Sequence, residues 1–128
     1  IVIPNQVKSI SDNCFSYCTN LEDVTFPESL TSIEYQAFYE CKSLKGALLP
    51  EGVNNIGYNA FQNCLGMKSI NIPAGVKNIK DCVFQGCSGL TNVTLNEGLE
   101  TIGKLAFYGC ASLPSITIPS TSSRSIRW

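Results

Sequence analysis

The stretch LEDVTFPESLTSIEYQAFYECKSL, residues 21–44, recurs along the chain with a spacing of 23 residues and decides the fold. A period in the range of roughly 20–50 residues is typical of stacked-repeat solenoids. The sequence therefore predicts a repeat solenoid in which each unit packs only against its neighbours. The most regular columns of this repeat, a phenylalanine and a cysteine three places later, are Phe15, Phe38, Phe61, Phe84 and Phe107 with Cys18, Cys41, Cys64, Cys87 and Cys110.

The period divides the 128 residues into a repeat array over 1–119 and a C-terminal segment, 120–128. The predicted units are 1–23, 24–46, 47–69, 70–92 and 93–115, with a partial unit at 116–119. Because Ile1 already occupies a strand column, we expect the chain to be a segment of a longer array. Two interpretations of 120–128 stay open: a partial cap in which Ile126 and Trp128 cover the core, or a frayed serine-rich tail.

Each unit opens with a short strand. In the second unit Val24 and Phe26 alternate with polar residues, as is typical of a strand with one buried face. Pro27 follows, and proline stands at the same place in the first, third, fourth and sixth units. Because proline cannot donate to a sheet ladder, its recurrence marks the end of the strand.

The rest of the unit returns the chain to the next strand. Leu30 and Ile33 predict a second short extended segment on the opposite wall of the coil. Phe38, Cys41 and Leu44 follow at i, i+3 and i+6, which keeps them on one side of a tight helical turn. No single layer can bury these residues, so stacking must form the core, with the phenylalanines about 4.8 Å apart.

The seven cysteines invite a disulfide or metal interpretation, but their arrangement favours packing. Five of them share one column, where a thiol behaves as a small hydrophobe. The chain has no histidine and no paired CxxC, so we expect no metal and no cofactor. Cys14 takes the column of Ala37 and Ala60 and is predicted to be buried, whereas Cys82 is the thiol predicted to be exposed.

Composition excludes several classes of function. The net charge of −1 predicts no nucleic-acid partner, and no apolar run is long enough to insert this segment into a membrane. Without histidine the commonest general base is missing, so we expect no enzyme activity. The carboxylates are interpreted as solvated surface because they fall in different columns: Glu22, Asp23, Glu28, Glu34, Glu40 and Asp81.

The pattern LxxVTFPxxLxxIxxxAFxxCxxL, read from Leu21 to Leu44, resembles the BspA-like leucine-rich repeat, also called the Treponema pallidum type. The resemblance covers 1–119. It implies a right-handed leucine-rich-repeat horseshoe of α/β or mainly β class, with a parallel sheet on its concave face and short helical turns elsewhere. It further implies a cell-surface or secreted, adhesin-like protein that binds a host matrix or cell-surface protein. The family shares no catalytic residues.

The concave strand face is the usual binding surface of such solenoids. Its outward residues are small, polar and nearly uncharged. Two interpretations stay open: a surface for a protein partner, or a plain solvated sheet in a passive structural spacer that presents another domain. The candidate protein-binding residues are Glu22, Asp23, Thr25, Lys45, Leu48, Lys68, Ser69, Asn71, Asn92, Thr94 and Thr117.

Tyrosines form a second candidate surface, because exposed tyrosine is a common interface anchor. They lie around the helical turn, on the predicted convex side, where we expect them to pack between coils instead. They are Tyr17, Tyr35, Tyr39, Tyr58 and Tyr108.

Overall fold

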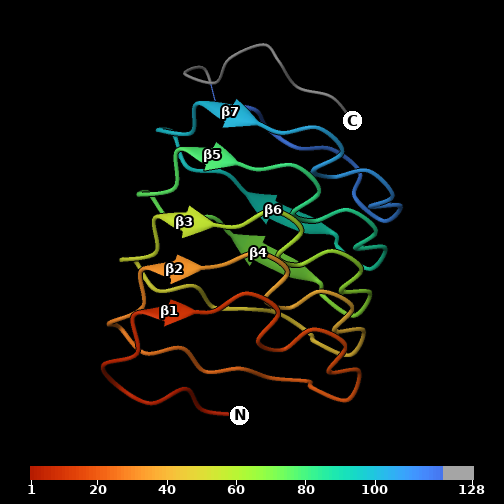
Figure 1. The fold of residues 1–128 in the computed structure, drawn as a ribbon. Coiled ribbons are helices and arrows are strands. Elements are labelled where there is room, and N and C mark those ends of the chain that lie inside the picture. The colour runs from red at the N-terminus through yellow and green to blue at the C-terminus, as the bar shows by residue number, and fades with distance from the viewer. Residues whose placement is uncertain (120–128) are drawn as a thin grey trace.

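The computed structural model describes residues 1–119, which wind into a stack of coils with the first coil at one end (Figure 1). We call them coils 1 to 5, beginning at residues 1, 24, 47, 70 and 93. The strands are short because each coil contributes only two or three residues to a ladder. They are β1 (Ser9–Ile10), β2 (Ser32–Ile33), β3 (Asn55–Ile56), β4 (Ser69–Asn71), β5 (Asn78–Ile79), β6 (Asn92–Thr94) and β7 (Thr101–Ile102).

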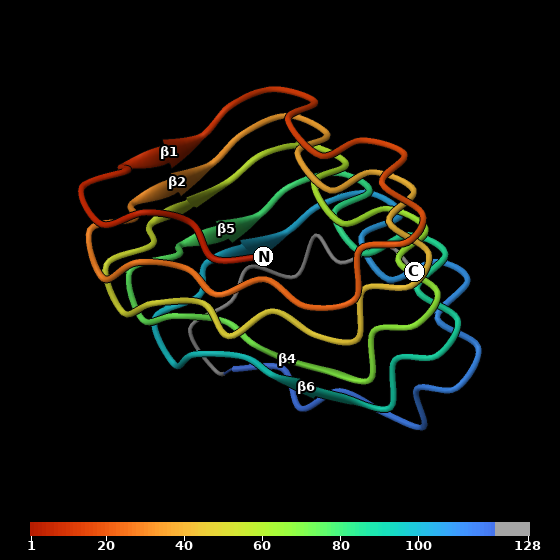
Figure 2. The ribbon, with the colours of Figure 1, turned by 90° about the horizontal axis from the view of Figure 1, so that it is seen from below.

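Two strand-bearing walls face different sides of the stack (Figure 2). The parallel pair β4 and β6 belongs to the wall that we call the strand face, where Val2 also bridges Thr25 and Gly46 bridges Ser69. The second wall carries β1–β2–β3 and, further along the stack, β5–β7. Each strand pairs with its equivalent one coil away, as Ser9 does with Ser32. The fold is thus the leucine-rich-repeat solenoid that the sequence predicts.

The third side, which we call the turn wall, carries the phenylalanines. It is a run of tight turns, and residues 1–119 contain no helix. The amide of Cys18 donates to the carbonyl of Phe15 at 3.1 Å, an i+3 to i bond that a helical turn would also make. Helix continuation is prevented because Asn13 and Tyr17 have φ values of 58° and 64°. Asparagine tolerates this left-handed region better than most residues.

The backbone hydrogen bonds between coils that are made by residues 13–17 and their equivalents on the turn wall all run in one direction. Asn13 and Phe15 donate their amides to the carbonyls of Tyr35 and Ala37 in the next coil, at 2.9 and 2.8 Å. Gln36 and Phe38 in turn donate onward to the third coil. N–H groups of this wall therefore point toward the last coil, and the accepting carbonyls point back toward the first.

The phenylalanines stack face to face along the axis of the solenoid. Ring centroids of Phe38 and Phe61 are 5.3 Å apart with an interplanar angle of 1°, and those of Phe61 and Phe84 are 5.7 Å apart. The three inner rings are fully buried, whereas Phe15 is half-buried because only one coil covers it. Phe26 meets Phe38 edge-on at 5.8 Å and extends the core toward the strand face.

The cysteine column lies beside this stack, and its three inner thiols are buried. Every thiol of the column after Cys18 donates to the phenylalanine carbonyl one coil earlier, as Cys64 does to Phe38 and Cys87 to Phe61, at 3.2 and 3.1 Å. Burial raises the pKa of Cys87 to about 12. These thiols are thus inert donors in the described structure.

The two cysteines outside the column differ from expectation. Cys14 is exposed, so the prediction that it is buried is wrong. Its equivalents Ala37 and Ala60 are covered by the coil before them, whereas Cys14 lies in the first coil and has a neighbour on one side only. Cys82, predicted to be the exposed thiol, is half-buried with a φ of 62°, and burial raises its pKa.

Candidate protein-binding face

The strand face carries an outward column of side chains between its buried residues. Leu48 is 83% exposed, the most exposed large apolar side chain described, and Val2 is 72% exposed. Thr25 and Asn71 are also exposed. The residues on either side of Thr25, Leu48 and Asn71 are buried, as Ala47 and Leu49 are, which is the alternation that a one-sided strand requires. The face therefore presents apolar groups within a polar surface.

A hollow of about 570 Å³ crosses this face between coils 2 and 4. Its walls come from the strand segments 23–25, 45–48 and 69–71. Six of the residues that the sequence suggests for binding line it together: Asp23, Thr25, Lys45, Leu48, Ser69 and Asn71.

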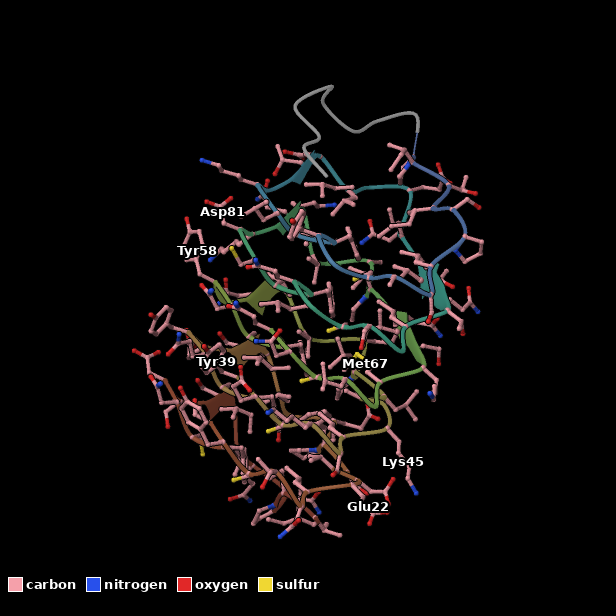
Figure 3. All side chains as sticks on the ribbon, turned by 90° about the vertical axis from the view of Figure 1, so that its right-hand side faces the viewer. Glu22, Tyr39, Lys45, Tyr58, Met67 and Asp81 are labelled. Carbon is pink, nitrogen blue, oxygen red and sulfur yellow. The ribbon has the colours of Figure 1, made fainter. Side chains whose placement is uncertain are left out.

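The edge of the face that precedes the strands is charged. Glu22 and Lys45 form an ion pair at 3.0 Å between two exposed side chains, and this hydrogen bond raises the pKa of Lys45 (Figure 3). Lys68 lies one coil further and lines a shallow hollow of about 490 Å³ with them. Because the pair is solvated, it contributes little to stability, and its charges remain accessible.

The remaining candidates lie toward the last coil. Asn92 and Thr94 flank the partly buried Val93 in β6 and pair in register with Ser69 and Asn71. Thr117 is exposed but lies outside the strands. The face therefore continues toward the last coil, but these three residues do not line the hollows described here. The recesses of the face are concentrated on coils 2 to 4.

A second hollow, of about 300 Å³, continues along the same face past the strand ends. It shares Thr25 and Leu48 with the first, and Glu28 and Glu51 line its far end. Sequence reasoning took Glu28 for solvated surface and did not consider Glu51. The signal was present, because glutamate follows the strand-ending residue in three of the five turns: Glu28, Glu51 and Glu97.

The backbone ladder of the strand face is interrupted beneath these hollows. Thr25 exchanges hydrogen bonds with coil 1, and Ile72 donates to Thr94. In contrast, no backbone hydrogen bond joins 24–26 to 47–49 within the described part of the chain. The interruption coincides with Ala47, in a column that otherwise has valine or isoleucine, and alanine favours strands less than either.

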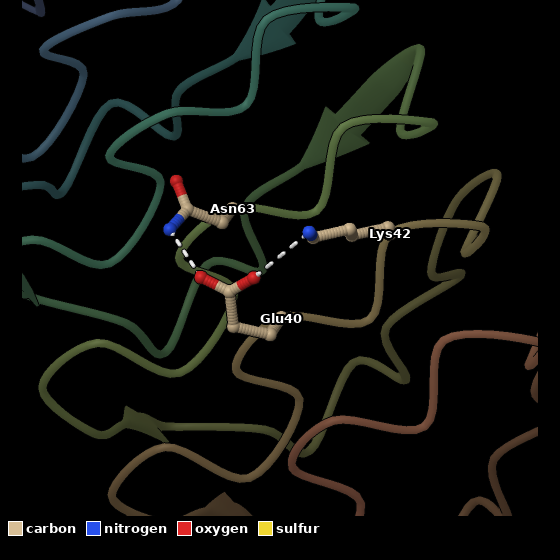
Figure 4. Close-up of polar contacts among 3 residues, drawn as sticks. All are labelled: Glu40, Lys42 and Asn63. Atoms are coloured by element: carbon tan, nitrogen blue, oxygen red, sulfur yellow. Dashed lines mark hydrogen bonds and ion pairs between the residues drawn. The ribbon is translucent and has the colours of Figure 1, made fainter.

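Several carboxylates outside this face have structural partners. Glu40 accepts a hydrogen bond from the side-chain amide of Asn63 at 2.6 Å and lies 3.6 Å from the ammonium of Lys42 (Figure 4). Glu34 accepts from the hydroxyls of Ser9 and Ser32. The interpretation of Glu34 and Glu40 as merely solvated is therefore wrong, since both join neighbouring turns or coils.

The prediction that the tyrosines pack between coils is wrong for most of them. The exposed tyrosines are Tyr17, Tyr35, Tyr58 and Tyr108, and the most exposed of these four is Tyr17, at 64%. They flank phenylalanines that point inward, so their own side chains turn outward. Tyr17 meets Tyr39 edge-on at 5.3 Å.

The described residues show neither a metal-binding cluster nor a membrane-spanning helix. Within 1–119, no three histidine, cysteine, aspartate or glutamate side chains come together to hold a metal ion. The same residues contain no helix long and apolar enough to cross a bilayer.

Comparison with known proteins agrees with this architecture. The family model described as a BspA-type leucine-rich repeat region, in six copies, matches residues 1–74 and 54–127. No curated protein matches the chain. Leucine-rich repeats of this family are generally non-enzymatic modules for protein interaction.

Three solved bacterial structures are similar. A leucine-rich repeat protein from Bacteroides ovatus is 30% identical over 88% of this chain, with a TM-score of 0.69. One from Eubacterium ventriosum is 29% identical over 94%, with a TM-score of 0.76. A leucine-rich cell surface protein from Faecalibacterium prausnitzii is 29% identical over 94%, with a TM-score of 0.61.

The chain spans only part of these proteins: 35% of the Bacteroides, 39% of the Eubacterium and 41% of the Faecalibacterium structure. The family model, in contrast, covers nearly the whole chain. The repeated Phe–Cys turn, the parallel one-coil register and this match lead to one conclusion. The chain belongs to the BspA-type leucine-rich repeat family.

Proposed function

We propose that this chain is a non-catalytic protein-binding module of a cell-surface or secreted protein, adhesin-like in role, that binds its partner through the strand face. The observation that carries the proposal is the recess on that face. Polar side chains from three adjacent strand segments line it, and Leu48 lies exposed among them. An exposed apolar group surrounded by polar ones is typical of a protein interaction site.

The surface location rests on similarity. One solved relative is described as a cell surface protein. The charge of the face also favours protein over nucleic acid, because Asp23, Glu28 and Glu51 lie around its hollows. A protein partner tolerates such a mixed surface, whereas a phosphate backbone requires a basic one.

The area of the face predicts weak binding by a single short array. Six successive layers of the array about 4.8 Å apart span roughly 25 Å, and a face about 20 Å wide offers about 500 Å². A standard interface takes about 800 Å² from each partner. We therefore propose that further repeats of the parent protein extend the same face.

The test is adhesion by the parent protein carrying Thr25→Arg and Asn71→Arg. Both side chains are exposed on the proposed face, so the arginines obstruct binding without entering the core. The matched control is Asn54→Arg with Ser88→Arg, which adds the same charge at exposed positions away from the hollows.

We expect the first variant to lose at least tenfold in adhesion to matrix protein and the control to keep it. Retention of adhesion by the first variant, with unchanged thermal unfolding, would overturn the proposal. A passive spacer that presents another domain would then be the better account of the chain.

A further inference from the structure

The recess between coils 2 and 3 has an apolar floor. Val24, Phe26 and Leu49 are buried beneath it, and Leu48 projects from it. The two hollows share Val24, Thr25 and Leu48, so they form one depression that runs along the strands and past their ends. We call this depression the seam groove. It is long in the strand direction, so its shape suits an extended chain lying parallel to the strands.

One end of the seam groove is acidic. Glu28 and Glu51 occupy the same place in adjacent coils, and both line the groove and are exposed. Their turns lie close together, since a Cβ added at Gly52 would lie 3.8 Å from the carbonyl oxygen of Glu28. Neither carboxylate has an ion-pair partner among residues 1–119. Two unpaired like charges this close favour a cationic occupant and disfavour an anionic one.

The opposite end of the groove has a different charge pattern. Lys45 is already paired with Glu22 at 3.0 Å, and Asp23 lies beside them. Lys68 lies one coil further on the same edge, so two lysines balance the two acids and this end is nearly neutral. A partner that matches the whole groove must place its positive charge at the Glu28–Glu51 end and not elsewhere.

We propose that the seam groove receives an extended, basic segment of a protein partner, with an apolar side chain against Leu48 and arginine or lysine side chains against Glu28 and Glu51. This inference rests on the proposed function, because it names the chemistry of the partner for the same face. Arginine suits the site best, since its guanidinium binds carboxylates in a planar, bidentate manner.

The test uses three short synthetic peptides in a serine–threonine background. The first has a leucine followed at the second and fourth places by arginine, the second has glutamate instead of arginine, and the third has alanine instead of leucine. Each is titrated into the isotope-labelled 128-residue chain, and binding is followed by amide chemical shifts of Thr25, Leu48 and Glu51. Only the first peptide is expected to saturate these shifts.

The charge requirement is tested with Glu28→Gln combined with Glu51→Gln. We expect the dissociation constant of the arginine–leucine peptide to rise about three- to tenfold, as for two exposed ion pairs. The matched control is Asp12→Asn combined with Glu100→Gln, which makes the same change in net charge at exposed positions outside the groove. The control should bind like the original chain.

Three outcomes would overturn the inference: no shift with the arginine–leucine peptide, equal binding of the glutamate peptide, or an equal loss in the control variant. Any of these leaves the proposed function standing if Thr25→Arg with Asn71→Arg still abolishes adhesion of the parent protein. If the peptide does not bind and the variant with Thr25→Arg and Asn71→Arg keeps its adhesion, the strand face itself is rejected as a binding surface. The two failures are therefore distinguishable.

Discussion

The thiol of Cys64 donates a hydrogen bond to the carbonyl oxygen of Phe38, one coil earlier, with an Sγ–O distance of 3.2 Å. The same bond recurs from Cys41 to Phe15 at 3.1 Å. It gives the cysteine column a directional role that a purely apolar side chain of similar size could not fill. The carbonyl of Phe38 also accepts the amide of Cys41, so each such carbonyl joins a turn within one coil to the coil above it.

Removing this bond should destabilise the stack. We expect Cys64→Ala to lower the free energy of unfolding by about 1–2 kcal/mol, because it deletes a buried sulfur and leaves a carbonyl with one partner fewer. Urea denaturation followed by circular dichroism measures the change. Cys14→Ala is the control, since Cys14 is exposed, and should stay within about 0.5 kcal/mol of the original chain. Equal losses in both variants would contradict the role of the bond.

Buried thiols should make stability fall at alkaline pH. Burial raises the pKa of Cys41 to about 11 and of Cys87 to about 12, from an ordinary value of 9.0. Unfolded thiols therefore lose their protons first, and between pH 9 and about 12 the native state binds more protons than the unfolded state. Stability is retained below pH 9 and lost above it. Urea midpoints of Cys87→Ala should fall less over this range, and an identical fall would refute the prediction.

Loss of an inner ring should cost much more than loss of an outer one. Phe61 is fully buried between two stacked neighbours, so Phe61→Ala should cost about 3–5 kcal/mol. Phe15 is half-buried with one stacked neighbour, so Phe15→Ala should cost clearly less. Denaturant melts of the two variants give the comparison. Similar losses would mean that stacking along the axis does not determine the contribution of each ring.

Substitutions at Gly86 and Gly109 allow the cost of backbone strain to be measured separately from the cost of a steric clash. Gly86 and Gly109 have φ values of +76° and +80°, so alanine at either position costs about 1–2 kcal/mol of strain. At Gly86 alone, the added methyl would also lie 1.9 Å from Oδ1 of Asn63. We therefore expect Gly86→Ala to destabilise the chain more than Gly109→Ala. Adding Asn63→Ser should remove the excess, and a double-mutant cycle measures it; strict additivity would exclude the clash.

Periodic columns explain why the architecture could be predicted from the sequence. Every column that faces the core, such as that of Phe38 and Cys41, repeats without a gap, and stacking identical layers allows few alternatives. The left-handed positions were less visible, although asparagine at 13 and 59 was a signal for them. Their φ values turn the expected helical segment into a run of tight turns.

The wrong predictions concern residues whose exposure depends on features that the 23-residue repeat does not encode. Cys14 shares a column with buried alanines, yet its exposure is set by the absence of a covering coil within the described structure. Tyr35 and Tyr58 share a column, but periodicity alone does not say whether a column points inward or outward. The groove depends on Ala47 and on an interrupted ladder, which are departures from the repeat. The two interpretations of 120–128, a partial cap with Ile126 and Trp128 or a frayed tail, concern residues outside the described ones.

The one-way hydrogen bonds of the turn wall have an electrostatic consequence. The peptide unit of Asp12 and Asn13 is bonded to that of Tyr35 and Gln36, which continues to Tyr58, so peptide dipoles line up head to tail along the solenoid axis. An α-helix sums its dipoles in the same way, to about half an elementary charge at each end. Here the positive end lies at the last coil, the reverse of the helix convention relative to chain direction. A longer array would move these partial charges further apart without increasing them.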